Sequence, residues 1–144
     1  MISKELILSG TKFRKTVHVT VYDEDIEIKP LTELEISKVF KTVESSGAST
    51  TDPKLSDNYL MQIEACRYGI ADPALHEIVN PDAPKADQKE VFESMVGNAL
   101  IEIGREIIEI STVSSKELSD FFKEQKANGF SGSTIQDTKS VTDQ

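Results

Sequence analysis

Residues 13–43 read FRKTVHVTVYDEDIEIKPLTELEISKVFKTV, and two periodicities follow one another in this stretch. Over residues 13–22 apolar and polar side chains alternate, which is typical of a half-buried strand. The expected apolar face holds Phe13, Val17, Val19 and Val21. The alternation resumes at Ile26, after the three acidic residues 23–25. We therefore predict a β-hairpin over about residues 13–29, with residues 23–25 as its connection.

The second periodicity predicts a helix over about residues 33–45. Thr32 and Glu35 have the spacing of a capping box at the start of a helix. In this arrangement each side chain accepts a hydrogen bond from the backbone N–H of the other residue. Apolar residues then recur at the spacing of one helix face, at Ile36, Val39, Phe40 and Val43. The helix should stop near Ser45, because residues 46–53 have the composition of a loop.

A helix over about residues 57–68 is expected next, with Leu60, Ile63 and Cys66 facing inward. Gly69 stands where a left-handed terminating residue would end it. Three prolines between residues 72 and 87 then rule out a long helix and predict an irregular crossing, with room for one turn around residues 74–79.

The longest helix is expected over about residues 88–110, since its broad apolar stripe is typical of the central helix of a bundle. Gly97 and Gly104 lie on this segment and lower its helix propensity, so we expect another element to approach closely there. A last helix is predicted over about residues 115–125, with Ser114 and Glu117 as its capping pair. Its expected inward residues are Leu118, Phe121 and Phe122.

These segments predict an α+β fold, mainly α, in which an N-terminal β-hairpin precedes a bundle of about four helices. At 144 residues the chain has room for one ordinary core, so we expect a single domain over residues 1–126. Residues 127–144 are rich in polar side chains and are predicted to form a flexible polar tail.

The charge distribution argues against nucleic acid as a partner. The formal charge is −9; residues 1–16 contribute +3 and residues 127–144 contribute −1, which leaves −11 for the middle of the chain. A body this acidic repels phosphate backbones. The longest apolar stretch is interrupted by charged residues, and the first residues lack the pattern of a signal peptide, so we expect neither a membrane span nor secretion but a cytoplasmic protein.

No constellation of residues predicts catalysis, a cofactor or a metal site. Asp23, Asp25 and Glu27 suggest calcium at first sight, but this segment lacks the glycine and glutamate that a calcium-binding loop needs at its sixth and twelfth positions. Neither histidine, His18 nor His76, stands in a motif with a nucleophile. Cys66 lies on an inward helical face and is expected to be a small core residue. We therefore expect the protein not to be an enzyme.

Residues 21–35 (VYDEDIEIKPLTELE) and residues 66–73 (CRYGIADP), followed by a long helix with Gly97, resemble the tail assembly chaperones of long-tailed bacterial and archaeal viruses. The resemblance covers about residues 13–125. It implies a small protein of the host cytoplasm, not retained in the mature virion, which binds the tape-measure protein and assists polymerisation of the tail-tube protein. In that family a programmed frameshift near the end of the gene often yields a longer second product.

A chaperone of this kind would bind a helix in an apolar groove. The candidate protein-binding residues on the predicted apolar faces are Phe92, Ile103, Ile107, Phe121 and Phe122. Each of them also fits a position in the core. Self-association is open, because a bundle of this size has several apolar stripes to cover.

Two other functions fit the same sequence. One is a structural tail-completion or connector protein that stays in the virion, and the other is an acidic protein-binding adaptor unrelated to viruses.

Overall fold

The computed structural model describes residues 1–49, 56–112 and 115–128. For residues 44–49 it describes the backbone alone. In chain order the elements are α1 (Lys4–Ser9), the 3₁₀ helix η1 (Gly10–Lys12), β1 (Lys15–Val19), β2 (Glu24–Ile28), α2 (Glu33–Ser49), α3 (Asp57–Gly69), α4 (Pro73–Val79), α5 (Lys85–Glu93), α6 (Ala99–Ile110) and α7 (Lys116–Ala127). The fold is α+β and mainly α, as the sequence predicts. The predicted polar tail lies outside the described residues from residue 129 onward.

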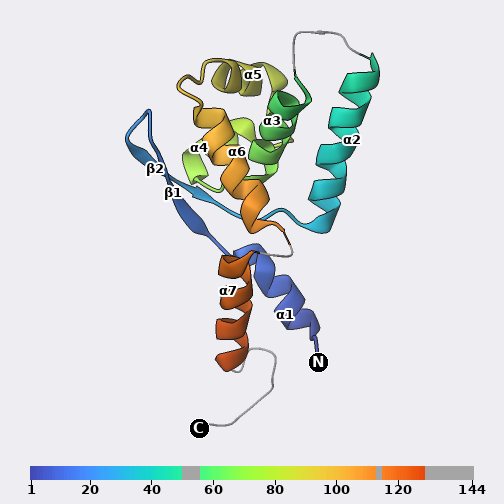
Figure 1. Ribbon diagram of the computed structural model, residues 1–144, viewed down its shortest axis with the longest axis vertical. Helices are drawn as coiled ribbons and strands as arrows, with labels where there is room; N and C mark the ends of the chain where they lie inside the picture. The colour runs from blue at the N-terminus through green and yellow to red at the C-terminus, as the bar shows by residue number, and fades with distance from the viewer. Residues whose placement is uncertain (50–55, 113–114, 129–144) are drawn as a thin grey trace.

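Figure 1 shows the arrangement of these elements. Helices α3 and α6 lie side by side in the centre of the main body, with the hairpin and α4 on one side and α2 on the other. Helices α1 and α7 contact each other and project from one end of this body.

The hairpin forms because its register places both apolar sets on one face. Val17 pairs with Ile26 across the antiparallel ladder, and both are buried together with Val19 and Ile28. The turn, however, covers residues 20–23, so the predicted connection at residues 23–25 is wrong: Glu24 and Asp25 belong to β2. Asp23 ends the turn at φ 52°, a left-handed conformation that aspartate tolerates.

The outer edge of β2 is covered by the chain that leaves α3. Ile70 forms a β-bridge with Ile28, and both side chains are completely buried. The N–H of Lys29 donates to the carbonyl of Gly69 at 2.8 Å, and the N–H of Ala71 donates to the carbonyl of Glu27 at 2.8 Å. The hairpin is therefore joined to the helical layer through backbone hydrogen bonds as well as through side-chain packing.

Helices α3 and α6 approach closely because glycines lie where they meet. A Cβ on Gly104 would lie 2.0 Å from Oε1 of Gln62, and a Cβ on Gly69 would lie 2.4 Å from Cγ2 of Ile107. The expected close approach at Gly104 is confirmed. The expected left-handed conformation of Gly69 is wrong, since Gly97 is the only glycine in the described ranges with a positive φ. Gly69 remains helical and makes room for Ile107.

The inner face of α3 also differs from the prediction in part. Cys66 is completely buried, as expected, and lies beside Ala65 and Gln62. Leu60 and Ile63 are only half-buried. The inner face is rotated toward Gln62 because the two glycine contacts bring that side of α3 against α6.

The predicted long helix over residues 88–110 is wrong, because the chain forms two helices there. α5 ends at Glu93 and α6 begins at Ala99, and between them Gly97 and Asn98 have φ values of 63° and 62°. Glycine and asparagine are the residues that adopt this conformation most readily, so they allow a turn here. Val21 of the hairpin turn contacts Gly97, where a Cβ would lie 2.4 Å from Cγ2 of Val21. Val21 is 44% exposed and lies outside the buried strand face that was expected to contain it.

Several helix ends differ from the prediction. The Thr32–Glu35 pair caps α2 in both directions, as expected, but α2 continues through Ser49 rather than stopping near Ser45. Residues 50–53 of the predicted loop lie outside the described residues. The capping residue of α7 is Ser115, whose hydroxyl accepts from the N–H of Leu118, whereas Ser114 lies outside the described residues.

Two short helices complete the fold. α1 was not predicted, because six residues are too few to show a helical periodicity; Ser3 caps it by accepting from the N–H of Leu6. α4 occupies the position of the turn considered for residues 74–79 and begins with Pro73 at its first position, where proline is favoured.

Replacement of Gly69 by alanine should lower the free energy of unfolding by about 1–2 kcal/mol, because overpacking against Ile107 outweighs the gain of about 1 kcal/mol in helix propensity. Urea denaturation followed by circular dichroism measures the change. Adding Ile107→Val, which removes one of the contacting methyl groups, should recover part of the loss. A Gly69→Ala variant as stable as the wild type would contradict the close packing of α3 on α6.

Candidate protein-binding surface

Three of the five predicted binding residues lie in the core. Phe92 of α5 and Ile103 of α6 are each 2% exposed, and Ile107 of α6 is completely buried. Their side chains are therefore almost entirely covered by the rest of the fold, although Ile103 also lines a hollow between the hairpin, α4 and α6. They hold α3, α5, α6 and the hairpin together instead.

The other two predicted residues, on α7, have separate roles. The ring of Phe121 packs edge-on against Phe13 at the start of the hairpin, with the ring centroids 5.3 Å apart. Phe122 contacts Gly10, where an added Cβ would lie 3.0 Å from the tip of its ring. Phe121 thus fastens α7 to the body, and Phe122 faces α1.

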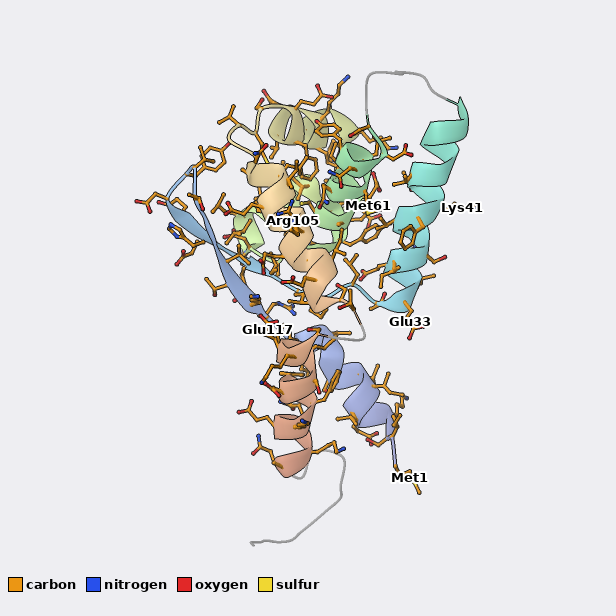
Figure 2. All side chains as sticks on the ribbon, in the orientation of Figure 1. Met1, Glu33, Lys41, Met61, Arg105 and Glu117 are labelled. Atoms are coloured by element: carbon orange, nitrogen blue, oxygen red, sulfur yellow. The ribbon has the colours of Figure 1, made fainter. Side chains whose placement is uncertain are left out.

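We call α1 and α7 together the arm, because they pack on each other and project from the body (Figure 1). Lys15 of β1 joins the arm to the body, since its Nζ donates to Oε1 of Glu106 on α6 at 2.9 Å and also to Glu117 on α7. These hydrogen bonds raise the pKa of Lys15, and the one to Glu117 has the larger effect. Figure 2 shows Glu117 at the end of α7 that meets the body.

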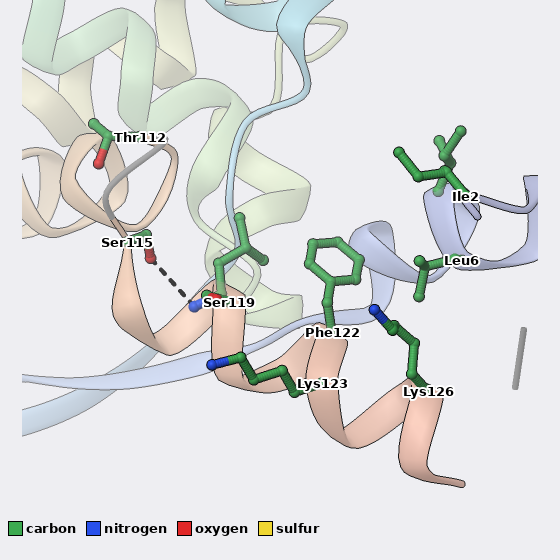
Figure 3. A pocket seen from close by; sticks show the side chains of 10 residues that line it. Ile2, Leu6, Thr112, Ser115, Ser119, Phe122, Lys123 and Lys126 are labelled. Carbon is green, nitrogen blue, oxygen red and sulfur yellow. Dashed lines mark hydrogen bonds between the residues drawn. The ribbon is translucent and has the colours of Figure 1, made fainter. Parts of the chain in front are cut away.

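A groove of about 510 Å³ lies between the two helices of the arm. Its apolar lining comes from Ile2, Leu6 and Ile7 on the α1 side and from Leu118 and Phe122 of α7. Figure 3 shows Phe122 facing Leu6 across this groove. We call it the α1–α7 groove. Sequence reasoning missed its α1 side, since the only signal there was a cluster of three apolar residues after Lys4 and Glu5.

Two further hollows continue from this groove toward α2. One of about 430 Å³ shares Ile7, Leu118 and Phe122 with it. The next, of about 220 Å³, lies between α2, α3 and α6 and is lined mainly by apolar side chains, including Val39, Phe40 and Met61. These last two hollows share Leu31, Ile36 and Ser111. The three hollows therefore form one continuous surface, which we call the apolar face. The middle hollow also has Lys29, Glu33 and Glu35 in its lining.

Several large apolar side chains beside the apolar face are exposed rather than buried. Phe40, which the helical pattern predicted to face inward, is 56% exposed. Ile7 lines the face and is 64% exposed. The exposed large apolar residues of α1, α2 and the first residues of the chain are Met1, Ile2, Ile7, Leu8, Leu34 and Phe40. Of these, Ile2, Ile7 and Phe40 line the apolar face. Exposed apolar side chains that line one surface are typical of a protein-binding site.

Ser111 holds the middle of the apolar face together. Its hydroxyl donates to the carbonyl of Ile107 at 2.6 Å and accepts from the N–H of Leu31 at 2.9 Å. The end of α6 is thereby tied to the segment that leads into α2.

A fourth hollow, of about 400 Å³, lies on the other side of the body between the hairpin, α4 and α6. Its apolar lining includes Ile26, Leu75 and Ile78, and its acidic lining residues are Glu24, Asp25 and Asp72. Asp72 caps α4 by accepting from the N–H of Leu75. Asp25 accepts from His18. Two of the three carboxylates therefore already have partners within the fold.

The hairpin turn is held against α6 by Glu102. Its carboxylate accepts from the N–H of Thr20 at 2.9 Å and from the hydroxyl of Thr20 at 2.8 Å, and these hydrogen bonds lower the pKa of Glu102. In the same region the N–H of Val96 donates to the hydroxyl of Tyr22 at 3.1 Å.

Nothing in the described ranges assembles a metal site, because no three His, Cys, Asp or Glu side chains come together in a suitable arrangement there. Burial raises the pKa of the Cys66 thiol, and its Sγ lies 4.0 Å from the carbonyl oxygen of Leu100. Among the described helices, none has the length and apolar character needed to cross a membrane.

His18 should titrate above its ordinary pKa of 6.5, because the carboxylates of Asp25, at 2.8 Å, and Asp23, at 3.1 Å, stabilise the imidazolium form. Its contribution to stability is therefore present below the pKa of the unfolded chain and is lost as pH rises through the raised pKa of the folded state. NMR titration of the ring protons measures this pKa. Asp25→Asn should lower it more than Asp23→Asn, and equal pKa values in the wild type and both variants would contradict the pairing.

Comparison with known protein families, with curated proteins and with solved structures finds no match for this chain.

Proposed function

We propose that this protein is a non-enzymatic tail assembly chaperone of a long-tailed virus, which binds the tape-measure protein and assists polymerisation of the tail tube. It acts in the host cytoplasm and is not retained in the mature virion. The proposal rests on the resemblance of residues 13–125 to that family and on the apolar face of α1, α2, α6 and α7. The apolar face is the observation that carries it.

The shape of the apolar face suits an elongated helical partner. A helix presents apolar residues at i, i+3, i+4 and i+7, and it binds by laying this stripe into a hydrophobic groove. The three linked hollows offer such a groove, from Ile2 and Leu6 at one end to Val39 and Phe40 at the other. A tape-measure protein is a long, largely helical chain, so one copy of this protein would cover one short section of it.

The negative charge of the protein suits a chaperone that shields the apolar surface of its partner from water. The chain has a formal charge of −9, and net charge far from zero keeps a complex soluble while its apolar surfaces are occupied. Many copies that each bind weakly along one partner would hold it through avidity. The same weak binding would let the copies leave when tail-tube subunits replace them.

Substitution of Phe40 by serine should weaken binding of the tape-measure protein about tenfold, since an aromatic side chain in an interface commonly contributes more than 1 kcal/mol. The stability of the fold should change little, because the side chain is 56% exposed. The partner is the long helical protein encoded beside this chain. Co-production of the two proteins shows whether they form a complex, and titration with a purified fragment of the partner measures the affinity.

The matched control for this experiment is Val96→Ser. Val96 is 59% exposed but lies in the α5–α6 turn, away from the apolar face, so its loss should leave binding unchanged. If the Phe40→Ser variant binds as tightly as the wild type, α2 is not part of the interface.

Mass spectrometry of purified virus particles tests the role in assembly. A chaperone should be abundant in infected cells and missing from finished particles. If the protein is found in particles at a fixed stoichiometry, it is a structural tail component and the chaperone proposal fails. If the genes beside it encode neither a tail-tube protein nor a long helical protein, the chain is an adaptor of another system.

A further inference from the structure

We infer that the α1–α7 groove takes an amphipathic helix whose apolar stripe is flanked by aspartate or glutamate. This inference deepens the proposed function and rests on it for the identity of the natural partner. The groove itself and the charges around it do not depend on that identity.

The apolar floor of the groove sets the first requirement for the partner. Leu6 and Phe122 lie on opposite sides of it, and Ile7 and Leu118 connect it to the neighbouring hollow. Leu6 is buried within the fold, but Leu118 and Phe122 are only half-buried, and Ile7 is 64% exposed. A partner that fills the groove would therefore cover these three side chains with apolar side chains of its own.

The charges at the groove set the second requirement. Two residues that line it are charged, Lys123 and Lys126, and both are lysines on the exposed side of α7. Figure 3 shows Lys126 reaching from α7 toward Leu6 at the rim. Within the described residues neither of these lysines forms an ion pair, whereas Lys116 is paired with Asp120 at 2.8 Å.

The acidic residues of the arm do not line the groove. Glu117 is paired with Lys15 and Asp120 with Lys116, and neither lines it. α1 carries Lys4 and Glu5, and α7 carries three side chains of each sign, so the arm as a whole is neutral. The formal charge of −9 therefore lies outside the arm. The groove is thus an apolar site whose charged lining residues are both lysines, on an otherwise acidic protein.

Complementarity of charge then selects the class of partner. A helix with acidic flanks would bring carboxylates to Lys123 and Lys126 while its apolar stripe fills the groove. A helix with basic flanks would meet like charges at the rim. Pairing of these carboxylates with Lys123 and Lys126 would also favour one orientation of the bound helix in the groove.

Two designed peptides of about 18 residues, roughly five helical turns, test this inference. Both have the same leucine stripe, and one has glutamate on its flanks where the other has lysine. Fluorescence anisotropy with the full-length protein measures their affinities at low and at high salt. The glutamate peptide should bind the wild type, and its affinity should fall as salt rises because the rim is exposed.

The double variant Lys123→Glu/Lys126→Glu should bind the glutamate peptide roughly tenfold more weakly, since two attractive surface pairs become repulsive. The matched control is Lys89→Glu/Arg105→Glu, which makes the same change in net charge at exposed positions of α5 and α6. The control should bind within about twofold of the wild type. Phe122→Ser tests the floor of the groove and should lose most of the binding, with a circular dichroism melt as the check that it folds.

Failure of the glutamate peptide to bind the wild type would overturn the inference, and so would equal loss of binding in the control variant. Sedimentation of the protein alone tests for a second copy in the groove: a dimer that the Lys123→Glu/Lys126→Glu variant dissociates would replace the proposed partner with another copy of the chain.

If the glutamate peptide binds at the groove but the tape-measure protein does not bind, the inference stands and the proposed function fails. If the tape-measure protein binds with no effect of the groove variants, the proposed function stands and the inference fails.

Discussion

The contact between α3 and α6 positions both the hairpin and α2. Gly69 and Gly104 let the two helices approach until Ile107 and Gln62 fill the space that two Cβ atoms would otherwise occupy. Because Ile70 follows directly, the end of α3 is also where β2 is joined to the helices. Ser111 follows the C-terminal end of α6, and its hydroxyl accepts from the N–H of Leu31 in the segment that leads to α2. A wider spacing of these two helices would therefore displace the hairpin and α2 together, and with α2 the middle of the apolar face.

The parts of the fold that could be predicted from the sequence are those in which one local pattern decides the outcome. The alternation around Val17 and Ile26 predicts the hairpin, and the Thr32–Glu35 pair predicts the start of α2. The division between α5 and α6 could not be predicted in the same way. The apolar spacing continues across Gly97 and Asn98 as if the helix did, and the turn is favoured by a contact with Val21, which is distant in the sequence.

The candidate site was harder to predict than the fold, for a physical reason. A helical stripe marks residues that avoid water, but it does not say whether this protein or a partner covers them. Ile103 and Phe40 carry the same signal in the sequence, yet one is buried by the hairpin and α3 and the other remains exposed on α2. The α1 side of the groove has too short a pattern to be recognised, and its importance comes from α7, more than 100 residues later in the chain.

Cys66 gives the protein a property unrelated to its partners. It is the only cysteine in the chain, it is completely buried between α3 and α6, and burial raises the pKa of its thiol. Thiol reagents react with the thiolate, so the native state shields this sulfur both by lack of access and by protonation. Alkylation of this one sulfur would therefore require the two central helices to separate, and its rate would report how often they do so in a living cell.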